Sequence, residues 1–310
     1  MSLPHAGVLW AIGGIFAILI IASIVVFALK RAKPQANLSE LESRVKSWWV
    51  MVVVFFVALT LSRVVSIFFF CLVSVLAFRE YVSLIPTRTA DRGILFWAFL
   101  AIPTQYFWVA YDWYGMFIIW IPVYAFLGLT MRMVLVGETK GFLRAAGTLH
   151  WGLMATVFAV SHLAALMLLP AEPGTPGGAG LVLYLVFLTQ SNDVAQYIWG
   201  KAFGRRPVAP TVSPNKTLEG LLGGVATTTL LASLLAPLLT PLDLTQSISV
   251  GLMIGLAGFI GDVVMSALKR DLDIKDSGTL LPGHGGILDR LDSLTYTAPL
   301  FFHYVNYTIF

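Results

Sequence analysis

The stretch from Ser266 to Asp292, SALKRDLDIKDSGTLLPGHGGILDRLD, concentrates charge in a chain that is otherwise strongly apolar. Together with Asp262 just upstream it holds eleven ionisable side chains, whereas the whole chain is 58% hydrophobic and only 12% charged. Carboxylates can hold Mg²⁺, lysines and arginines neutralise phosphoryl oxygens, and glycines beside a histidine let backbone N–H groups approach an anion. This mixture indicates phosphoryl or nucleotidyl transfer through a metal ion.

The rest of the chain predicts an all-α fold, a polytopic integral membrane bundle of about nine to ten transmembrane helices. Mean hydropathy is +0.84, and apolar runs near the ~20 residues that a bilayer requires recur along the chain. We expect spans at about 8–29, 48–61, 64–78, 94–111, 113–131, 149–169, 181–199, 218–240, 247–267 and 294–309. Residues 1–310 are predicted to form one membrane domain, with N-terminal helices in 1–180 and the catalytic motifs in 181–310.

The second and third spans are open to two interpretations. Both are shorter than the ~20 residues of a full span, so they form either a tight transmembrane hairpin around Ser62-Arg63 or a re-entrant pair. The segment from Arg79 to Arg92 that follows them is predicted to be a basic loop.

The distribution of basic residues predicts the orientation in the membrane, because Lys and Arg accumulate in cytoplasmic loops. Under the ten-span interpretation, 19 of the 20 basic residues fall on one side, and only Arg63 falls on the other. Both termini are therefore expected outside, with the stretch from Ser266 to Asp292 in the cytoplasm. The net charge of +4 indicates attraction to anionic lipid headgroups, and we expect no nucleic-acid partner.

Two carboxylates within predicted spans point to a functional site. Asp193 lies eight residues before Lys201, and Asp262 lies seven before Lys269. At ~1.5 Å per residue, each carboxylate is roughly 10–12 Å from the basic end of its helix. Asp262, Ser266 and Lys269 share one helix face. Ionisable groups at such depth are costly and usually functional, although a purely packing role for a capped carboxylate is the alternative.

Three blocks of the sequence carry a resemblance to a known family. The run S-x-x-K-R-x4-K-D-x-G-x3-P-G-H-G-G-x2-D-R-x-D, starting at Ser266, resembles the signature of the phosphatidate cytidylyltransferases, or CDP-diacylglycerol synthases. Ser213 to Gly220 resembles the S-P-x-K-T-x-E-G motif of that family. Asn192 to Gly200 resembles a third block in part, because this chain has Val194 and Gln196 where the family usually has Thr and an adjacent Ala-Tyr pair. The resemblance covers roughly the last 40% of the chain.

The resemblance implies transfer of the cytidylyl group from CTP to phosphatidic acid or a related lipid phosphate, with release of pyrophosphate. It implies Mg²⁺ as cofactor, permits a second cation, and leaves open whether the chain forms a homodimer. We expect an integral protein of the bacterial inner membrane, in contact with membrane lipids, whose active site faces the cytoplasm.

Specific residues receive roles under this hypothesis. The residues expected in catalysis are Asp262, Asp289, Lys269, Arg270, Lys275, Asp276, His284 and Arg290. Those expected to bind substrate are Ser213, Lys216, Thr217, Ser266, Gly285 and Gly286. Those expected to hold metal are Asp262 and Asp289, with Asp193 and Asp292 as further ligands or outer partners. For His284, a role in turn geometry is the alternative to phosphate contact.

Other functions compete with this one. A CTP-dependent lipid kinase acting on a polyprenol-type alcohol would need the same metals and cations but would transfer the γ-phosphate. A transporter would place its charges near the bilayer midplane, whereas here they gather at one face. A catalytically silent relative is a further alternative, because Val194 and Gln196 depart from the family pattern.

Overall fold

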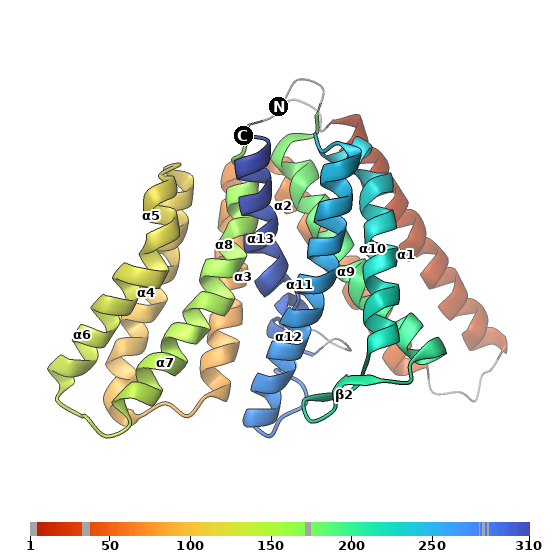
Figure 1. The fold of residues 1–310 in the computed structure, drawn as a ribbon. Helices are drawn as coiled ribbons and strands as arrows, with labels where there is room; N and C mark the ends of the chain where they lie inside the picture. Colours follow the sequence, from red (N-terminus) through yellow and green to blue (C-terminus); the bar gives the residue numbers. More distant parts are fainter. Residues whose placement is uncertain (1–4, 33–37, 171–174, 279, 281–282, 284) are drawn as a thin grey trace.

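The computed structural model describes residues 5–32, 38–170, 175–278, 280, 283 and 285–310 of the 310-residue chain. Its long helices run alternately up and down, so that the start of α1 and the end of α13 lie at the same end of the molecule (Figure 1). The helices are α1 (Ala6–Ala32), α2 (Ser39–Leu61), α3 (Arg63–Leu84), α4 (Arg92–Ala110), α5 (Tyr114–Ile119), α6 (Phe126–Val136), α7 (Phe142–Leu153), α8 (Ala159–Leu166), α9 (Gly177–Phe203), α10 (Leu218–Leu239), α11 (Leu244–Asp271), α12 (Leu288–Leu291) and α13 (Leu294–Thr308).

Two pairs of these helices are continuous. A π-helical turn, Trp120–Ala125, joins α5 to α6, and another, Met154–Phe158, joins α7 to α8. Counting each pair once, eight helical segments in the described part of the chain are long and apolar enough to cross a membrane. The 27-residue α9 and the 15-residue α13 lie alongside them. The predicted all-α, polytopic membrane architecture is therefore confirmed.

The helical hairpin α2–α3 contains the second and third predicted spans. The helices have 23 and 22 residues and meet at Ser62, and both are long and apolar enough to cross a membrane, which favours the transmembrane hairpin over the re-entrant pair. The Ser62 hydroxyl accepts a hydrogen bond from the Val65 N–H at 3.2 Å and caps α3. The helix continues to Leu84, so the first part of the predicted basic loop is helical.

The structure also contains a small antiparallel sheet that the sequence did not predict. Strand β1 (Pro207–Ala209) pairs with β2 (Ser213–Thr217) at the end of the molecule opposite the chain termini (Figure 1). The Thr217 hydroxyl then caps α10 by accepting from the Gly220 N–H at 3.2 Å. The block from Ser213 to Gly220 is thus a strand that runs directly into a capped helix.

Glycines bring α9, α10 and α11 close together. A Cβ placed on Gly255 of α11 would lie 3.0 Å from the Cα of Val225 on α10. A Cβ on Gly224 of α10 would run into the side chain of Gln196 on α9. Small residues allow such close approach, which matters in a membrane because packing contacts drive much of helix association there.

We predict that Gly255→Leu pushes α10 away from α11 and destabilises the protein by about 1–3 kcal/mol, the usual cost of overpacking. Thermal unfolding of the purified protein in detergent measures the loss. The matched control is Gly128→Leu on α6, where an added Cβ has no atom within 4 Å. Equal stability of the two variants would contradict the close packing.

Candidate active site

Two lysine–aspartate ion pairs connect α11 to β2 and to α12. Lys216 of β2 pairs with Asp262 of α11. Lys269 of α11 pairs with Asp289 of α12, with 2.9 Å between Nζ and Oδ1. The Lys269 and Asp289 side chains are only 16% and 7% exposed, so each largely buried charge needs the other.

Two further carboxylates lie beside these pairs. The Ser293 hydroxyl donates to Asp193 of α9, at 3.0 Å from Oδ1 and 3.1 Å from Oδ2. The Ser293 N–H donates to Asp292 Oδ1 at 2.8 Å. Burial and the negative charge of Asp262 raise the pKa of Asp292 to about 6. Ser293 thus contacts both Asp193 and Asp292, and the negative charge of Asp262 acts on Asp292.

These carboxylates bear on the predicted magnesium site. Among the described residues, no three His, Cys, Asp or Glu side chains are arranged as a ready-made metal site. Asp193, Asp262 and Asp292 nevertheless supply an all-oxygen donor set, which Mg²⁺ prefers, and their mutual repulsion is what a cation would relieve. The residues present therefore fit the ion in chemistry, although Asp262 faces Lys216 in this conformation.

Asp289 organises the loop before it. Its Oδ2 accepts hydrogen bonds from the N–H of Ser277 at 2.9 Å and of Gly286 at 3.1 Å. Burial alone would raise the pKa of Asp289, but the hydrogen bond from Lys269 and those backbone donors outweigh it and lower the pKa below its usual value. Both oxygens of Asp289 are thus already engaged by the protein.

The glycines of the loop lie close to Asp289. Gly285 has φ of +78°, a left-handed conformation that favours glycine. The Gly286 N–H donates to Asp289 in this conformation, and its predicted use as a phosphate cradle stays a prediction. His284 lies outside the described residues.

The remaining predicted residues divide into two groups. Ser266 donates to Asp262 at 3.3 Å, and the Nε of Arg290 is buried without a hydrogen-bond partner among the described residues. Both belong to the site. By contrast, Lys275 and Asp276 are exposed and make no contact with the ion pairs within the described structure.

Three other predicted residues lie on the strand side of the site. Arg270 is exposed and donates to the Val212 carbonyl at 3.2 Å, which ties the end of α11 to the turn before β2. Ser213 begins β2, and Thr217 caps α10. The structure therefore gives Arg270 and Thr217 supporting contacts near Lys216.

One residue of this region was missed by the sequence analysis. Glu80 of α3 accepts hydrogen bonds from the Ser277 hydroxyl, from the Ile287 N–H at 2.9 Å and from the Leu288 N–H at 3.1 Å. It was assigned to a basic loop. The available signal was a carboxylate near the C-terminal end of a long apolar helix, where the helix dipole gives negative charge no stabilisation.

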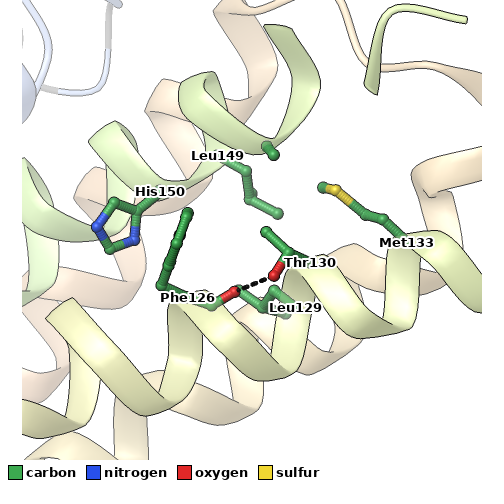
Figure 2. Close-up of a pocket in the computed structure, with 7 residues that line it drawn as sticks. Phe126, Leu129, Thr130, Met133, Leu149 and His150 are labelled. Atoms are coloured by element: carbon green, nitrogen blue, oxygen red, sulfur yellow. Dashed lines mark hydrogen bonds between the residues drawn. The ribbon is translucent and has the colours of Figure 1, made fainter. Parts of the chain in front are cut away.

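Two cavities lie elsewhere. The gap between α6 and α7 in Figure 2, lined by side chains such as Phe126, Met133 and His150, has a volume of only about 10 Å³ and is too small for a substrate. A cleft of about 630 Å³ between α3, α7 and α11 is large enough for a ligand. It is lined by Val264, Ala267 and Asp271, on the other face of α11 from Asp262 and Ser266, and so is separate from the charged site.

The geometry of three converging blocks agrees with comparisons to known proteins. The chain belongs to the cytidylyltransferase family, whose profile matches residues 42–308. It is 45% identical over 293 residues to the uncharacterized protein YnbB of Escherichia coli strain K12, an alignment that covers 94% of this chain and 96% of YnbB.

The chain is also similar to curated phosphatidate cytidylyltransferases over a shorter region. It is 39% identical over 126 residues to that of Bacillus subtilis strain 168, covering 40% of this chain and 47% of the relative. It is 45% identical over 144 residues to that of Pseudomonas aeruginosa, covering 44% of this chain and 53% of the relative. The chain thus spans about half the length of these two enzymes.

We predict that Lys269 and Asp289 are strongly coupled, because removing one partner leaves the other charge largely buried. A double-mutant cycle with Lys269→Met and Asp289→Asn should give a coupling of about 1–3 kcal/mol in unfolding free energy. The control is the pair Lys46–Glu42 on the exposed side of α2, at 3.2 Å, for which no measurable coupling is expected. Independent effects at Lys269 and Asp289 would show that the pair does not stabilise the site.

Proposed function

We propose that this protein transfers the cytidylyl group of CTP to phosphatidic acid and releases pyrophosphate, at the cytoplasmic face of a bacterial inner membrane. The observation that carries the proposal is the convergence of Asp193, Lys216, Asp262, Lys269 and Asp289 around α11. The family supports nucleotidyl transfer, and the similarity to phosphatidate cytidylyltransferases supports phosphatidate as the acceptor.

The reaction would proceed by direct attack. A phosphate oxygen of the lipid forms a bond to the α-phosphorus of CTP, and the bond from that phosphorus to the bridging oxygen of pyrophosphate breaks. No side-chain nucleophile is required, because catalysis of phosphoryl-type transfer is mostly positioning and charge neutralisation. The protein must therefore supply cations where the two phosphate groups meet.

Lys216, Lys269 and Arg290 are the cations proposed to bind the phosphate groups. Lys216 and Lys269 each contact a carboxylate now, and either ammonium can exchange that contact for a phosphoryl oxygen while staying close to its partner. The buried, unpaired Nε of Arg290 offers a further donor within the described site. These three groups would orient the triphosphate and hold the lipid phosphate against it.

A divalent ion is part of the proposal. Asp193, Asp262 and Asp292 would hold Mg²⁺, and Asp289 would join them only if it released bonds that it now makes. When bound, the ion would neutralise charge on the triphosphate. Ser293 and Ser266 orient the carboxylates of Asp193 and Asp262 by hydrogen bonds.

We predict that the purified protein, given CTP, Mg²⁺ and phosphatidic acid, forms CDP-diacylglycerol and pyrophosphate in equal amounts. Asp262→Asn should lower kcat by about 10²–10³-fold, the usual loss when a key electrostatic group is removed. Product mass and pyrophosphate release measure both. The control is Asp243→Asn, the same change in the capping residue at the opposite end of α11, where asparagine also caps well.

The alternatives give distinct results in the same assay. A lipid kinase, given a polyprenol-type alcohol, would form CDP and a phosphorylated lipid, with no pyrophosphate, and no product with lipid phosphates. Absence of product with lipid phosphates and with the alcohol would indicate a catalytically silent relative, and full activity of Asp262→Asn would remove that residue from the site.

We further predict that the Mg²⁺ concentration for half-maximal rate rises about 10-fold or more in Asp292→Asn, because one carboxylate of the donor set is lost. Rates measured at increasing concentrations of free Mg²⁺, all high enough to keep CTP complexed with Mg²⁺, test this. Removal of divalent ions with a chelator should abolish turnover reversibly. An unchanged Mg²⁺ dependence in the variant would exclude Asp292 from the ion's surroundings.

A further inference from the structure

Glu80 of α3 connects the N-terminal helices to the loop between α11 and α12. Its Oε1 accepts from the Leu288 N–H at 3.1 Å and from the Ser277 hydroxyl, and its Oε2 accepts from the Ile287 N–H at 2.9 Å. These donors lie 197 to 208 residues away along the chain. A single carboxylate therefore holds two separate parts of the loop.

The position of Glu80 is not explained by the stability of α3. Glu80 lies four residues before the end of α3, and a carboxylate near the C-terminal end of a helix gains no stability from the helix dipole, whose negative end lies there. By contrast, Ile287 and Leu288 begin α12, a helix that has no cap from its own side chains. Glu80 supplies the missing acceptor for these N–H groups, so it caps α12 from another part of the fold.

The loop is shaped to admit this side chain. A Cβ on Gly286 would run into the Glu80 carboxylate, and one on Gly278 would lie 3.0 Å from its Cδ. Glycine at positions 278 and 286 leaves room for the Glu80 side chain between these two parts of the loop.

The contacts of Glu80 and Asp289 are interlocked. The backbone N–H of Ser277 donates to Asp289, while its hydroxyl donates to Glu80. The N–H of Gly286 donates to Asp289, and those of Ile287 and Leu288 donate to Glu80. Displacing Glu80 would therefore release the segment that holds Asp289 opposite Lys269.

We propose that Glu80 is a positioning residue. It holds the loop and α12 so that Asp289 meets Lys269, and so that Arg290 and Asp292 lie beside the two ion pairs. It touches no substrate in this role and acts through Ser277 and the start of α12. Its effect on the loop is independent of the reaction, whereas its effect on turnover rests on the proposed cytidylyl transfer.

Glu80→Gln is the sharpest test, because the amide keeps the size of the side chain but offers one acceptor oxygen and places a donor against N–H groups. Hydrogen exchange of the Ile287 and Leu288 N–H groups, measured by mass spectrometry on the full-length protein in detergent, should accelerate at least about 10-fold. Ser277→Ala, which removes one of the three bonds, should give a smaller increase. Glu138→Gln, in the exposed turn before α7, is the control and should change neither.

Kinetics separate positioning from simple stability. In Glu80→Gln, kcat should fall about 10- to 100-fold, the range found when a residue that orients active-site groups is lost. The KM for CTP and the thermal unfolding temperature should stay near those of the unaltered protein. Glu80→Asp should restore part of kcat, because the carboxylate is retained.

Three outcomes would overturn the proposal. Unchanged exchange at Ile287 and Leu288 in Glu80→Gln would show that the carboxylate does not hold the loop. Faster exchange with full kcat would show that the loop does not position the active groups. A fall in kcat that follows only a lower unfolding temperature would mark Glu80 as merely structural. If the unaltered protein turns over no lipid phosphate with CTP, the proposed function fails, and the exchange measurement alone decides whether Glu80 holds the loop.

Discussion

Compensation of partly buried charge is the constraint on which this structure depends. Removing an ion from water costs several kcal/mol unless a partner of opposite charge or a set of hydrogen-bond donors replaces the lost hydration. Asp262 and Asp289 have lysines, Asp193 has the Ser293 hydroxyl, and Glu80 has the hydroxyl and N–H groups of the loop. Because most of these partners lie far apart in the chain, the charged site exists only when the bundle is assembled.

Close packing of α9, α10 and α11 places the site. Next to Asp193 in α9, Asn192 donates to the Gly255 carbonyl of α11 at 3.3 Å and accepts from the Thr228 hydroxyl of α10 at 3.0 Å. This buried network joins the three helices where their glycines bring the backbones together. Asp193 and Asp262 consequently lie within α9 and α11, two helices that this packing holds together.

The N-terminal helices do more than fill the membrane. The similarity to phosphatidate cytidylyltransferases covers about 40% of the chain, whereas the family profile and the similarity to YnbB extend over most of it. Through Glu80, α3 contacts the loop that carries the densest charge.

The two departures from the family pattern differ in their surroundings. Val194 lies on an exposed face of α9. Gln196 is buried against Gly224, with no hydrogen-bond partner for its amide among the described residues.

The sequence by itself determined the helical membrane architecture. A backbone that crosses lipid must satisfy its own hydrogen bonds, so apolar runs of bilayer length form helices. It also determined which blocks carry charge, since Asp193, Lys216 and the stretch from Ser266 to Asp292 stand out against apolar surroundings. The helices α2 and α3 are longer than the predicted second and third spans because each continues beyond its apolar run into polar residues. The sheet of β1 and β2 was missed because it rests on one short local pairing.

Only the tertiary structure decided which charges meet. Spacing along α11 placed Asp262 and Lys269 on one face, but their actual partners are Lys216 and Asp289, which come from a strand and a separate short helix. Gly286 looked free to bind phosphate, yet its N–H serves Asp289. Glu80 could not be placed at all, because a hydrogen bond across some 200 residues depends on the path of every helix between its two ends.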